Sequence, residues 1–211
     1  MRFGPAAAEH SSVAAIVGTG LGGGVVVAGR VVTGAAGMAG ELGHVHIPLR
    51  GLLEPDQPIP SCNCGFEGDA ESIASLTGIE RNLLPYWLTR YPDHELASVE
   101  PIAKAARLLR GLGERGDEMA LRIFEQQAIA IGRLFTVAAQ FTDPDVYFLG
   151  GGVVEAAPHF RQWFLGKVRE HTVLREEQRA ASELLLVHDL DMAGARGAAL
   201  AALQQVKASD G

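Results

Sequence analysis

The sequence predicts an α/β protein, and three observations lead to this prediction. A short apolar run near the start, Val13–Val17, has the length and composition of a buried strand. A second apolar run, Val146–Leu149, leads into Gly150–Gly152 and then a helical pattern, which is the strand, turn and helix order of α/β folds. Between them lies a long amphipathic pattern, Asp117 to about Phe141. Together these segments favour a sheet covered by helices.

The front of the chain is predicted to form a strand meander. After Val13–Val17 comes a glycine-rich loop, Gly18–Gly24, followed by two short β-branched runs, Val25–Val27 and Arg30–Val32, that read as a hairpin. Residues 1–12 show no periodicity, so we expect them to form a short leading segment before the sheet.

Helices are predicted from Asp69 onward. The clearest is the Asp117 to Phe141 pattern, which Asp117 can cap, and Pro144 lies just beyond its end. Its apolar residues recur at steps of three and four, at Ala120, Ile123, Phe124, Ile131, Leu134, Phe135 and Ala138.

The last part of the chain is predicted to continue the alternation of helix and strand. A helix containing Phe160, Trp163 and Val168 follows the second glycine run. A final strand, Leu184–Val187, precedes an alanine-rich helix from about Ala193 to Val206.

Composition and charge narrow the classes of function. Eighteen Lys and Arg against 25 Asp and Glu give a net charge of −7, which provides no broad basic surface, so we expect no nucleic-acid binding through this chain. Glycines interrupt the longest uncharged stretch, Ser11–Gly29, so we expect no membrane span. The start, Met1–Pro5, lacks the apolar segment of a secretory signal, and the cytoplasm is the expected compartment.

Two glycine turns follow predicted strands and are candidates for binding phosphate or nucleotide. In Gly18–Gly24, closely spaced glycines let backbone amides approach an anion, and Thr19 adds a hydroxyl. The second turn, Gly150–Gly152, lies at the carboxyl end of a strand, where open α/β sheets bind ligands. Close strand packing explains the first turn equally well, and a simple strand-to-helix turn explains the second.

Two further segments combine polar side chains suited to ligands. Glu41 and His44 lie three residues apart among small residues and could accept hydrogen bonds from a polyhydroxylated ligand, or be a surface acid and a structural histidine. Cys62 and Cys64 flank Asn63 in a turn and, with an upstream histidine, supply three zinc ligands. Asp69 is the nearest candidate for the fourth, with Glu67 and His46 as alternatives, and two free thiols are the other interpretation.

These segments together resemble the ROK family of sugar kinases and sugar-responsive repressors, whose fold is that of the actin-like ATPases. Residues 18–24 are similar to the family's second phosphate motif, Gly40–His44 to its sugar-contacting motif, and residues 146–152 to its adenosine motif. Cys62–Gly65, with the following Gly68 and Glu71, resembles its zinc knuckle and the sugar-binding glutamate after it. The resemblance begins near Val13 and covers only the C-terminal portion of the family's chain.

The resemblance implies a role for each of these residues and a set of ligands. ATP with Mg²⁺, a sugar and a structural Zn²⁺ are the expected ligands, and a homo-oligomer is the expected assembly. Glu41, His44 and Glu71 would hold the sugar; Gly18, Thr19, Gly20, Gly150 and Gly151 would line the ATP site; His44, Cys62, Cys64 and Asp69 would hold the zinc.

The expected fold is accordingly a three-layer, ribonuclease H-like lobe of the actin-like ATPase fold without its N-terminal lobe. We expect this lobe to cover residues 13–192, and residues 193–211 to form a C-terminal helix that packs on the N-terminal lobe.

The sequence departs from the family pattern in three places. Asp69 stands where the family commonly has a third cysteine, and the loop between His44 and Cys62, which contains Gly51–Pro60, is longer than usual. The family's Asp-Gly-Gly-Thr loop and its Asn-Asp pair, whose aspartate is the general base, do not occur in these 211 residues. We therefore expect no catalytic base in this chain and little activity from it alone.

The sequence leaves three functions open. The first is a sugar kinase for a hexose or N-acetylhexosamine. The second is the sugar-sensing lobe of a transcriptional regulator, and the third is a sugar-binding fragment without turnover.

Overall fold

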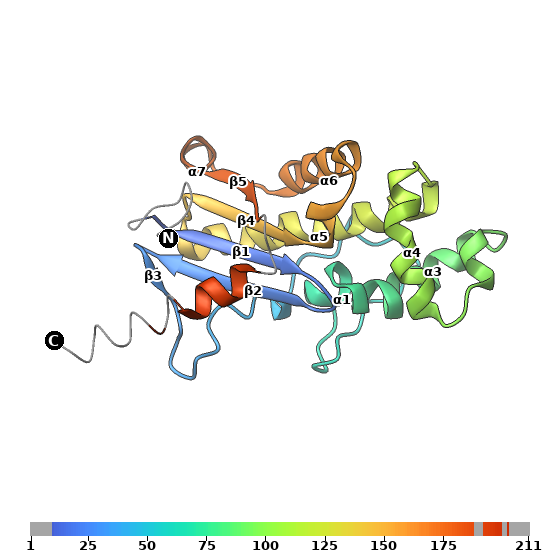
Figure 1. The fold of residues 1–211 in the computed structure, drawn as a ribbon, viewed down its shortest axis with the longest axis horizontal. Coiled ribbons are helices and arrows are strands. Elements are labelled where there is room, and N and C mark those ends of the chain that lie inside the picture. The colour runs from blue at the N-terminus through green and yellow to red at the C-terminus, as the bar shows by residue number, and fades with distance from the viewer. Residues whose placement is uncertain (1–9, 188–191, 200–201, 203–211) are drawn as a thin grey trace.

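The computed structural model describes residues 10–187, 192–199 and 202, and its centre is a mixed β-sheet (Figure 1). Within the described residues the sheet has five strands in the order β3-β2-β1-β4-β5. The strands are β1 Ser12–Val17, β2 Leu21–Val27, β3 Arg30–Val31, β4 Val146–Gly151 and β5 Glu183–Leu186.

The sheet joins the front of the chain to its last third. β1, β2 and β3 form an antiparallel meander, as predicted, with the β2–β3 turn at Ala28 and Gly29, both at positive φ. β1 also pairs in parallel with β4, and β4 in parallel with β5. In the β1–β4 pairing Val17 lies opposite Gly151, so the chain leaves both strands at the same edge of the sheet.

One long helix, α5, supports the sheet from one side. It begins at Glu118 after its N-cap Asp117, whose side chain accepts a hydrogen bond from the Ala120 amide, and ends at Thr142, close to the predicted bounds. The remaining helices are η1 Leu42–His44, α1 Glu71–Ala74, α2 Leu76–Gly78, η2 Ile79–Leu83, α3 Leu84–Arg90, η3 Glu95–Ser98, α4 Ile102–Glu114, η4 Gly152–Glu155, α6 Pro158–His171 and α7 Glu176–Ala181.

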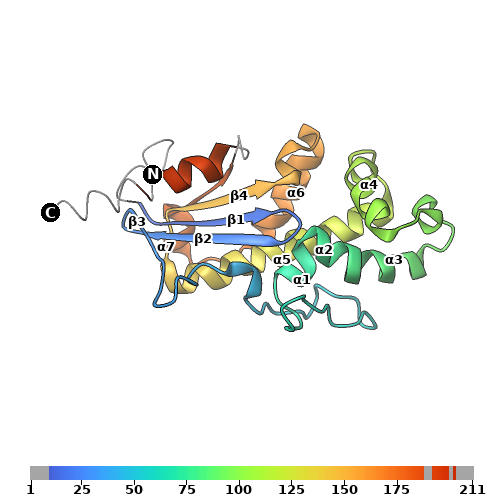
Figure 2. The ribbon, with the colours of Figure 1, turned by 60° about the horizontal axis from the view of Figure 1, so that its bottom comes forward.

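The core lies between the sheet and α5. Val13, Ala15 and Val17 alternate along β1 and are buried in the same cluster as the middle of α5. A smaller cluster, around Val146 and Phe148, covers the opposite face of the sheet. Figure 2 shows α5 on one side of the sheet and the helical residues 192–199 on the other.

Two predicted elements differ from the structure in extent. The glycine loop predicted over Gly18–Gly24 is confined to Gly18–Gly20, because Leu21 to Gly24 pair with β1 as part of β2. The predicted helix Ala193–Val206 is helical over 192–199 and at 202, and its other positions lie outside the described residues, as do residues 1–9 of the predicted leading segment.

The helices α1 to α4 lie beyond the carboxyl ends of β1 and β4 (Figure 1). The long loop Gly51–Pro60, which precedes α1, is held against α5 by buried glutamines. Gln126 of α5 exchanges hydrogen bonds with Gln57, donates to the Leu52 carbonyl and accepts from the Trp87 indole. Among the described residues no helix combines the length and apolar character needed to cross a bilayer.

Candidate functional site

The loop Gly18–Gly20 connects β1 to β2 at the sheet edge that faces α1 and α2. Its Gly18 amide donates to the Gly20 carbonyl at 2.9 Å, which closes the turn. Within the described residues no hydrogen bond uses the amides of Thr19 or Gly20, and Thr19 is exposed. Two free amides and a hydroxyl at the tip of a turn have the chemistry of a phosphate-binding loop.

The second glycine turn leaves the sheet beside the first. Gly151 has a φ of +119°, and a Cβ there would lie 1.9 Å from the Val17 carbonyl oxygen, so this position requires glycine. Arg110 of α4 donates to the Gly152 carbonyl at 3.0 Å and fixes the turn from the other side. Arg110 also lines a cavity of about 470 Å³ between α4 and η4, together with Arg107, Arg115 and Glu155, although the glycines of the turn are not among its lining residues.

The segment Gly40–His44 packs directly on β2. A Cβ on Gly23 would lie 2.2 Å from the Gly40 carbonyl oxygen, and a Cβ on Gly43 would lie 2.4 Å from the Leu21 carbonyl oxygen. These glycines let the backbone of the segment touch the strand that follows the first glycine loop. Glu41 is exposed, and no hydrogen bond or ion pair involves its carboxylate among the described residues.

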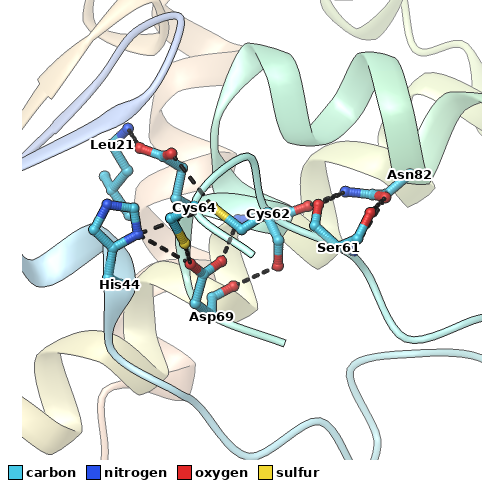
Figure 3. Close-up of polar contacts among 9 residues, drawn as sticks. Leu21, His44, Ser61, Cys62, Cys64, Asp69 and Asn82 are labelled. Atoms are coloured by element: carbon cyan, nitrogen blue, oxygen red, sulfur yellow. Dashed lines mark hydrogen bonds and ion pairs between the residues drawn. The ribbon is translucent and has the colours of Figure 1, made fainter. Parts of the chain in front are cut away.

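His44, Cys62, Cys64 and Asp69 converge on one point (Figure 3), and their ligand atoms all lie within 4.8 Å of one another. His44 Nδ1 lies 3.1 Å from Asp69 Oδ2 and 3.9 Å from Cys62 Sγ, and Cys64 Sγ lies 3.7 Å from Asp69 Oδ2. The structure thus brings together the four residues predicted as metal ligands. The alternatives Glu67 and His46 are not members of this cluster.

The local backbone explains how residues 44 and 69 meet. Residues 45–47 and 68–70 pair through two hydrogen bonds, from the Ala70 amide to the Val45 carbonyl and from the Ile47 amide to the Gly68 carbonyl. Gly65 and Gly68, both at positive φ, turn the chain between the cysteines and Asp69. The segment 60–72 is therefore a compact knuckle.

The four side chains fit a tetrahedral zinc ion. Zinc bonds to nitrogen, oxygen and sulfur of about 2.0–2.3 Å place tetrahedral ligand atoms about 3.3–3.8 Å apart. Three of the six distances between these atoms lie close to this range, and all six are within 4.8 Å, so a small adjustment of the side chains would accommodate the ion. Two thiolates, an imidazole and a carboxylate are all donors that zinc accepts. His44 uses Nδ1 toward the cluster, so its other ring nitrogen is left for a second partner.

Burial and hydrogen bonding set the ionisation of the cluster. The hydrogen bond to Asp69 raises the pKa of His44 above 6.5. Asp69 is completely buried, and although burial opposes ionisation, hydrogen bonds from His44 and Ser72 hold its pKa below 3.8. Burial raises the pKa of the Cys62 thiol to about 12. Without a metal, the cluster therefore contains an ionised aspartate beside a neutral thiol.

Two residues that hold these segments in place lie outside every motif recognised in the sequence. Asn82, in η2, donates to the Ser61 and Ser72 carbonyls and accepts from the Ser61 amide, which fastens the knuckle to the helices. Arg110 holds the second glycine turn from 42 residues away. Neither has a local pattern that could have revealed its partner.

Comparisons with known proteins give relatives of known activity. The glucokinase of Thermotoga maritima is 33% identical to this chain over 173 residues, which make up 81% of this chain and 50% of the relative. The N-acetyl-D-glucosamine kinase of Pectobacterium carotovorum is 36% identical over 140 residues, 65% of this chain and 42% of the relative. The chain spans about half the length of these curated relatives.

Solved structures of related proteins also match the fold of this chain. A ROK hexokinase from Thermus thermophilus matches with a TM-score of 0.69 and 32% identity over 96% of this chain and 59% of that chain. A ROK family transcriptional regulator, a homologue of the E. coli MLC protein, matches with a TM-score of 0.60 and 25% identity over 84% and 41%. These neighbours confirm the predicted α/β fold of the actin-like ATPases.

A sequence profile for the whole family is the broadest match. It is described as "ROK family" and matches residues 2–205, nearly the whole chain. The predicted resemblance is therefore confirmed, and this chain belongs to the ROK family.

Proposed function

We propose that this chain carries the sugar- and nucleotide-binding lobe of an ATP-dependent ROK sugar kinase acting on a hexose or N-acetylhexosamine. The observation that carries the proposal is the pairing of Val17 with Gly151. It sets two glycine turns side by side at one sheet edge, and β2, the strand that follows the first turn, contacts the segment bearing Glu41 and His44. The kinase relatives support the reaction class.

In this proposal the two turns bind ATP. The free amides of Thr19 and Gly20 and the Thr19 hydroxyl contact its phosphates, and Gly18 provides a close backbone approach. Gly150 and Gly151 face the adenosine, and the cavity beside Arg110 has room for its base. Mg²⁺ accompanies the phosphates and neutralises their charge.

The sugar lies against the segment Gly40–His44 in this proposal. The exposed Glu41 carboxylate accepts hydrogen bonds from two hydroxyls, and the free ring nitrogen of His44 contacts a third. Glu71 completes the set through the oxygen that lies nearer to Cys62. These contacts orient the hydroxyl that receives the phosphoryl group.

Zinc has a structural role in this proposal. His44 Nδ1, Cys62, Cys64 and Asp69 hold the ion, which supplies a cross-link between the sugar-contacting segment and the knuckle. Bound zinc would favour the thiolate form of both cysteines, whereas the buried Cys62 stays a neutral thiol without a metal.

We place no catalytic base among these 211 residues. The Asp-Gly-Gly-Thr and Asn-Asp motifs are missing from them, and Asp143 and Asp145 lie at the amino end of β4, opposite the glycine turn. Binding without substantial turnover is therefore the proposed behaviour of this chain by itself. The lobe over 13–192, the packing of helix 193–211, a homo-oligomer and a cytoplasmic location stay predictions.

Calorimetry tests this function with glucose, N-acetylglucosamine and a non-hydrolysable ATP analogue. We expect the wild-type chain to bind the analogue and at least one sugar. Glu41→Ala should lower the sugar affinity about tenfold or more, because a charged hydrogen-bond acceptor is lost, and should leave nucleotide affinity unchanged. Glu177→Ala, which removes an exposed acid on α7, is the matched control. A wild-type chain that binds neither ligand contradicts the proposal.

The second candidate function is the sugar-sensing lobe of a regulator, which the regulator among the structural neighbours favours. It predicts sugar binding without nucleotide binding. The same titrations therefore separate the two functions.

A further inference from the structure

We propose that Glu71 is a positioning residue for the phosphate loop Gly18–Gly20, and not only a ligand of the sugar. This inference rests on the proposed function, because it concerns the same nucleotide site. It assigns to Glu71 an effect on nucleotide binding that is present when no sugar is bound.

The contact between Glu71 and the loop is direct. Glu71 Oε2 accepts a hydrogen bond of 2.7 Å from the amide of Leu21, the residue at which the loop re-enters the sheet. A Cβ on Gly20 would lie 2.7 Å from the same oxygen. The Glu71 carboxylate therefore occupies the space that a side chain at position 20 would fill. Its hydrogen bond to the Leu21 amide fixes the end of the loop.

Neighbouring backbone groups hold the other end of the loop. The Leu76 amide donates to the Gly18 carbonyl at 3.0 Å, and the Thr77 amide donates to the Thr19 carbonyl at 3.1 Å. These contacts come from α2, which follows α1 and its first residue, Glu71. With its carbonyls and its exit amide satisfied in this way, the loop keeps the amides of Thr19 and Gly20 free for a ligand.

Glu71 also touches the two other parts of the site. Its second oxygen, Oε1, lies 3.6 Å from Cys62 Sγ in the metal cluster. A Cβ on Gly43 would lie 3.4 Å from the Glu71 Cβ, so the sugar-contacting segment packs on the same side chain. One carboxylate thus joins the phosphate loop, the knuckle and the sugar segment, and truncating it should loosen the loop.

Amide hydrogen exchange followed by NMR on the full 211-residue chain tests this role. In Glu71→Ala we expect exchange at Leu21, Leu76 and Thr77 to become about tenfold faster or more, because a charged hydrogen bond is lost. Glu71→Gln should restore slow exchange, since its carbonyl oxygen still accepts from Leu21. Glu177→Ala is the exposed-acid control.

A second variant tests the same contact with Glu71 in place. In Gly20→Ala the new Cβ pushes the flexible carboxylate away from Leu21, so it should accelerate exchange at the same three amides. In the Glu71→Ala background it should add nothing, because the contact is already gone. Unchanged exchange in Gly20→Ala would overturn the proposal even where Glu71→Ala does not fold. Where it does fold, additive effects in the double variant would also overturn the proposal.

Nucleotide titration without sugar completes the test. Glu71→Ala should bind the non-hydrolysable ATP analogue about tenfold more weakly than wild type, and Glu71→Gln should bind it nearly normally. If Glu71→Ala exchanges its loop amides faster but binds the nucleotide analogue with unchanged affinity, the positioning role is overturned. A wild-type chain that binds no nucleotide contradicts the proposed function instead, and the exchange rates then decide the structural role of Glu71 separately.

Discussion

Asp69 shows how one side chain can replace a cysteine and take on a second task. Its Oδ2 faces His44 and Cys64, while its Oδ1 accepts a hydrogen bond of 2.8 Å from the amide of Ser72, the second residue of α1. A cysteine has one sulfur and could fill only the first of these roles. A carboxylate at this position therefore stabilises the fold of the knuckle in the absence of a metal.

This arrangement predicts how zinc affinity responds to substitution at Asp69. Asp69→Asn should reduce zinc affinity by more than the roughly 10–100-fold that loss of an outer-sphere partner costs, because a charged ligand is removed. Competition with a chromophoric chelator measures the affinity. Glu67→Gln, which neutralises an exposed acid on the same knuckle outside the cluster, should leave it unchanged. Equal affinities of Asp69→Asn and wild type would remove Asp69 from the ligand set.

At the scale of elements, the backbone conformation at the end of β4 decides how the two glycine turns of the candidate site are placed. Gly151 combines a φ of +119° with a very close approach, since a Cβ there would lie 1.9 Å from the Val17 carbonyl oxygen. Any side chain there would push β1 and β4 apart at the edge from which both glycine turns leave the sheet.

Gly151→Ala should accordingly lower the free energy of unfolding by about 3 kcal/mol or more, because it adds backbone strain to a clash. The matched control is Gly166→Ala in α6, where a Cβ meets nothing within 4 Å. That change should raise stability by about 0.5–1 kcal/mol, as expected for alanine inside a helix. Urea unfolding of the three proteins checks both signs, and similar stabilities for Gly151→Ala and wild type would contradict the strand geometry.

Periodicity predicted the elements well where local pattern decides the structure. β1, β4 and α5 match their predicted ranges closely, because short continuous apolar runs are typical of buried strands and apolar residues at steps of three and four are typical of a helix. The sequence predicts that the run Leu21–Gly24 is part of a loop, because glycine has low strand propensity. Its glycines serve instead as strand residues on which the backbone of Gly40 packs, a contact between segments that no local pattern encodes.

The candidate site was predictable to the extent that its residues lie in motifs. The four metal-cluster residues were found from their spacing and the family resemblance, and the structure brings them together. The cavity beside Gly152 was not predictable, because Arg110 and Glu155 meet there from segments about 45 residues apart. The contact of Glu71 with Leu21 was likewise hidden, since it depends on the fold of the 50 residues between them.

At the scale of the whole molecule, the start of the described chain is held to the segment just before β4. Asp145, just before β4, accepts a hydrogen bond of 2.7 Å from the Ser11 amide, just before β1. The Ser11 amide, aided by His10, holds the pKa of Asp145 below its ordinary value of 3.8. Ionisation of this carboxyl is therefore linked to the pairing of β1 with β4.

The sign of the pH dependence follows from that lowered pKa. The contribution of Asp145 to stability is present above pH 3.8 and is lost as the pH falls through its lower value in the folded protein. Asp145→Asn should cost less than about 1 kcal/mol at neutral pH, because the side chain is 43% exposed, and the difference should vanish in acid. Chemical unfolding at both pH values checks this, with Asp93→Asn as the exposed control. A difference that grows on acidification would contradict it.

The parallel pairing of β1 with β4 also has a consequence for how the chain acquires its structure. Ser11 and Asp145, which immediately precede the two strands, are 134 residues apart, so their pairing closes a very long loop. Contacts of such separation form slowly, since the chain loses much entropy before they stabilise it. During synthesis the hairpin of β1 and β2 emerges long before β4. We therefore expect the sheet edge that carries both glycine turns to form late in folding, after α5 has formed and the strands can pack on it.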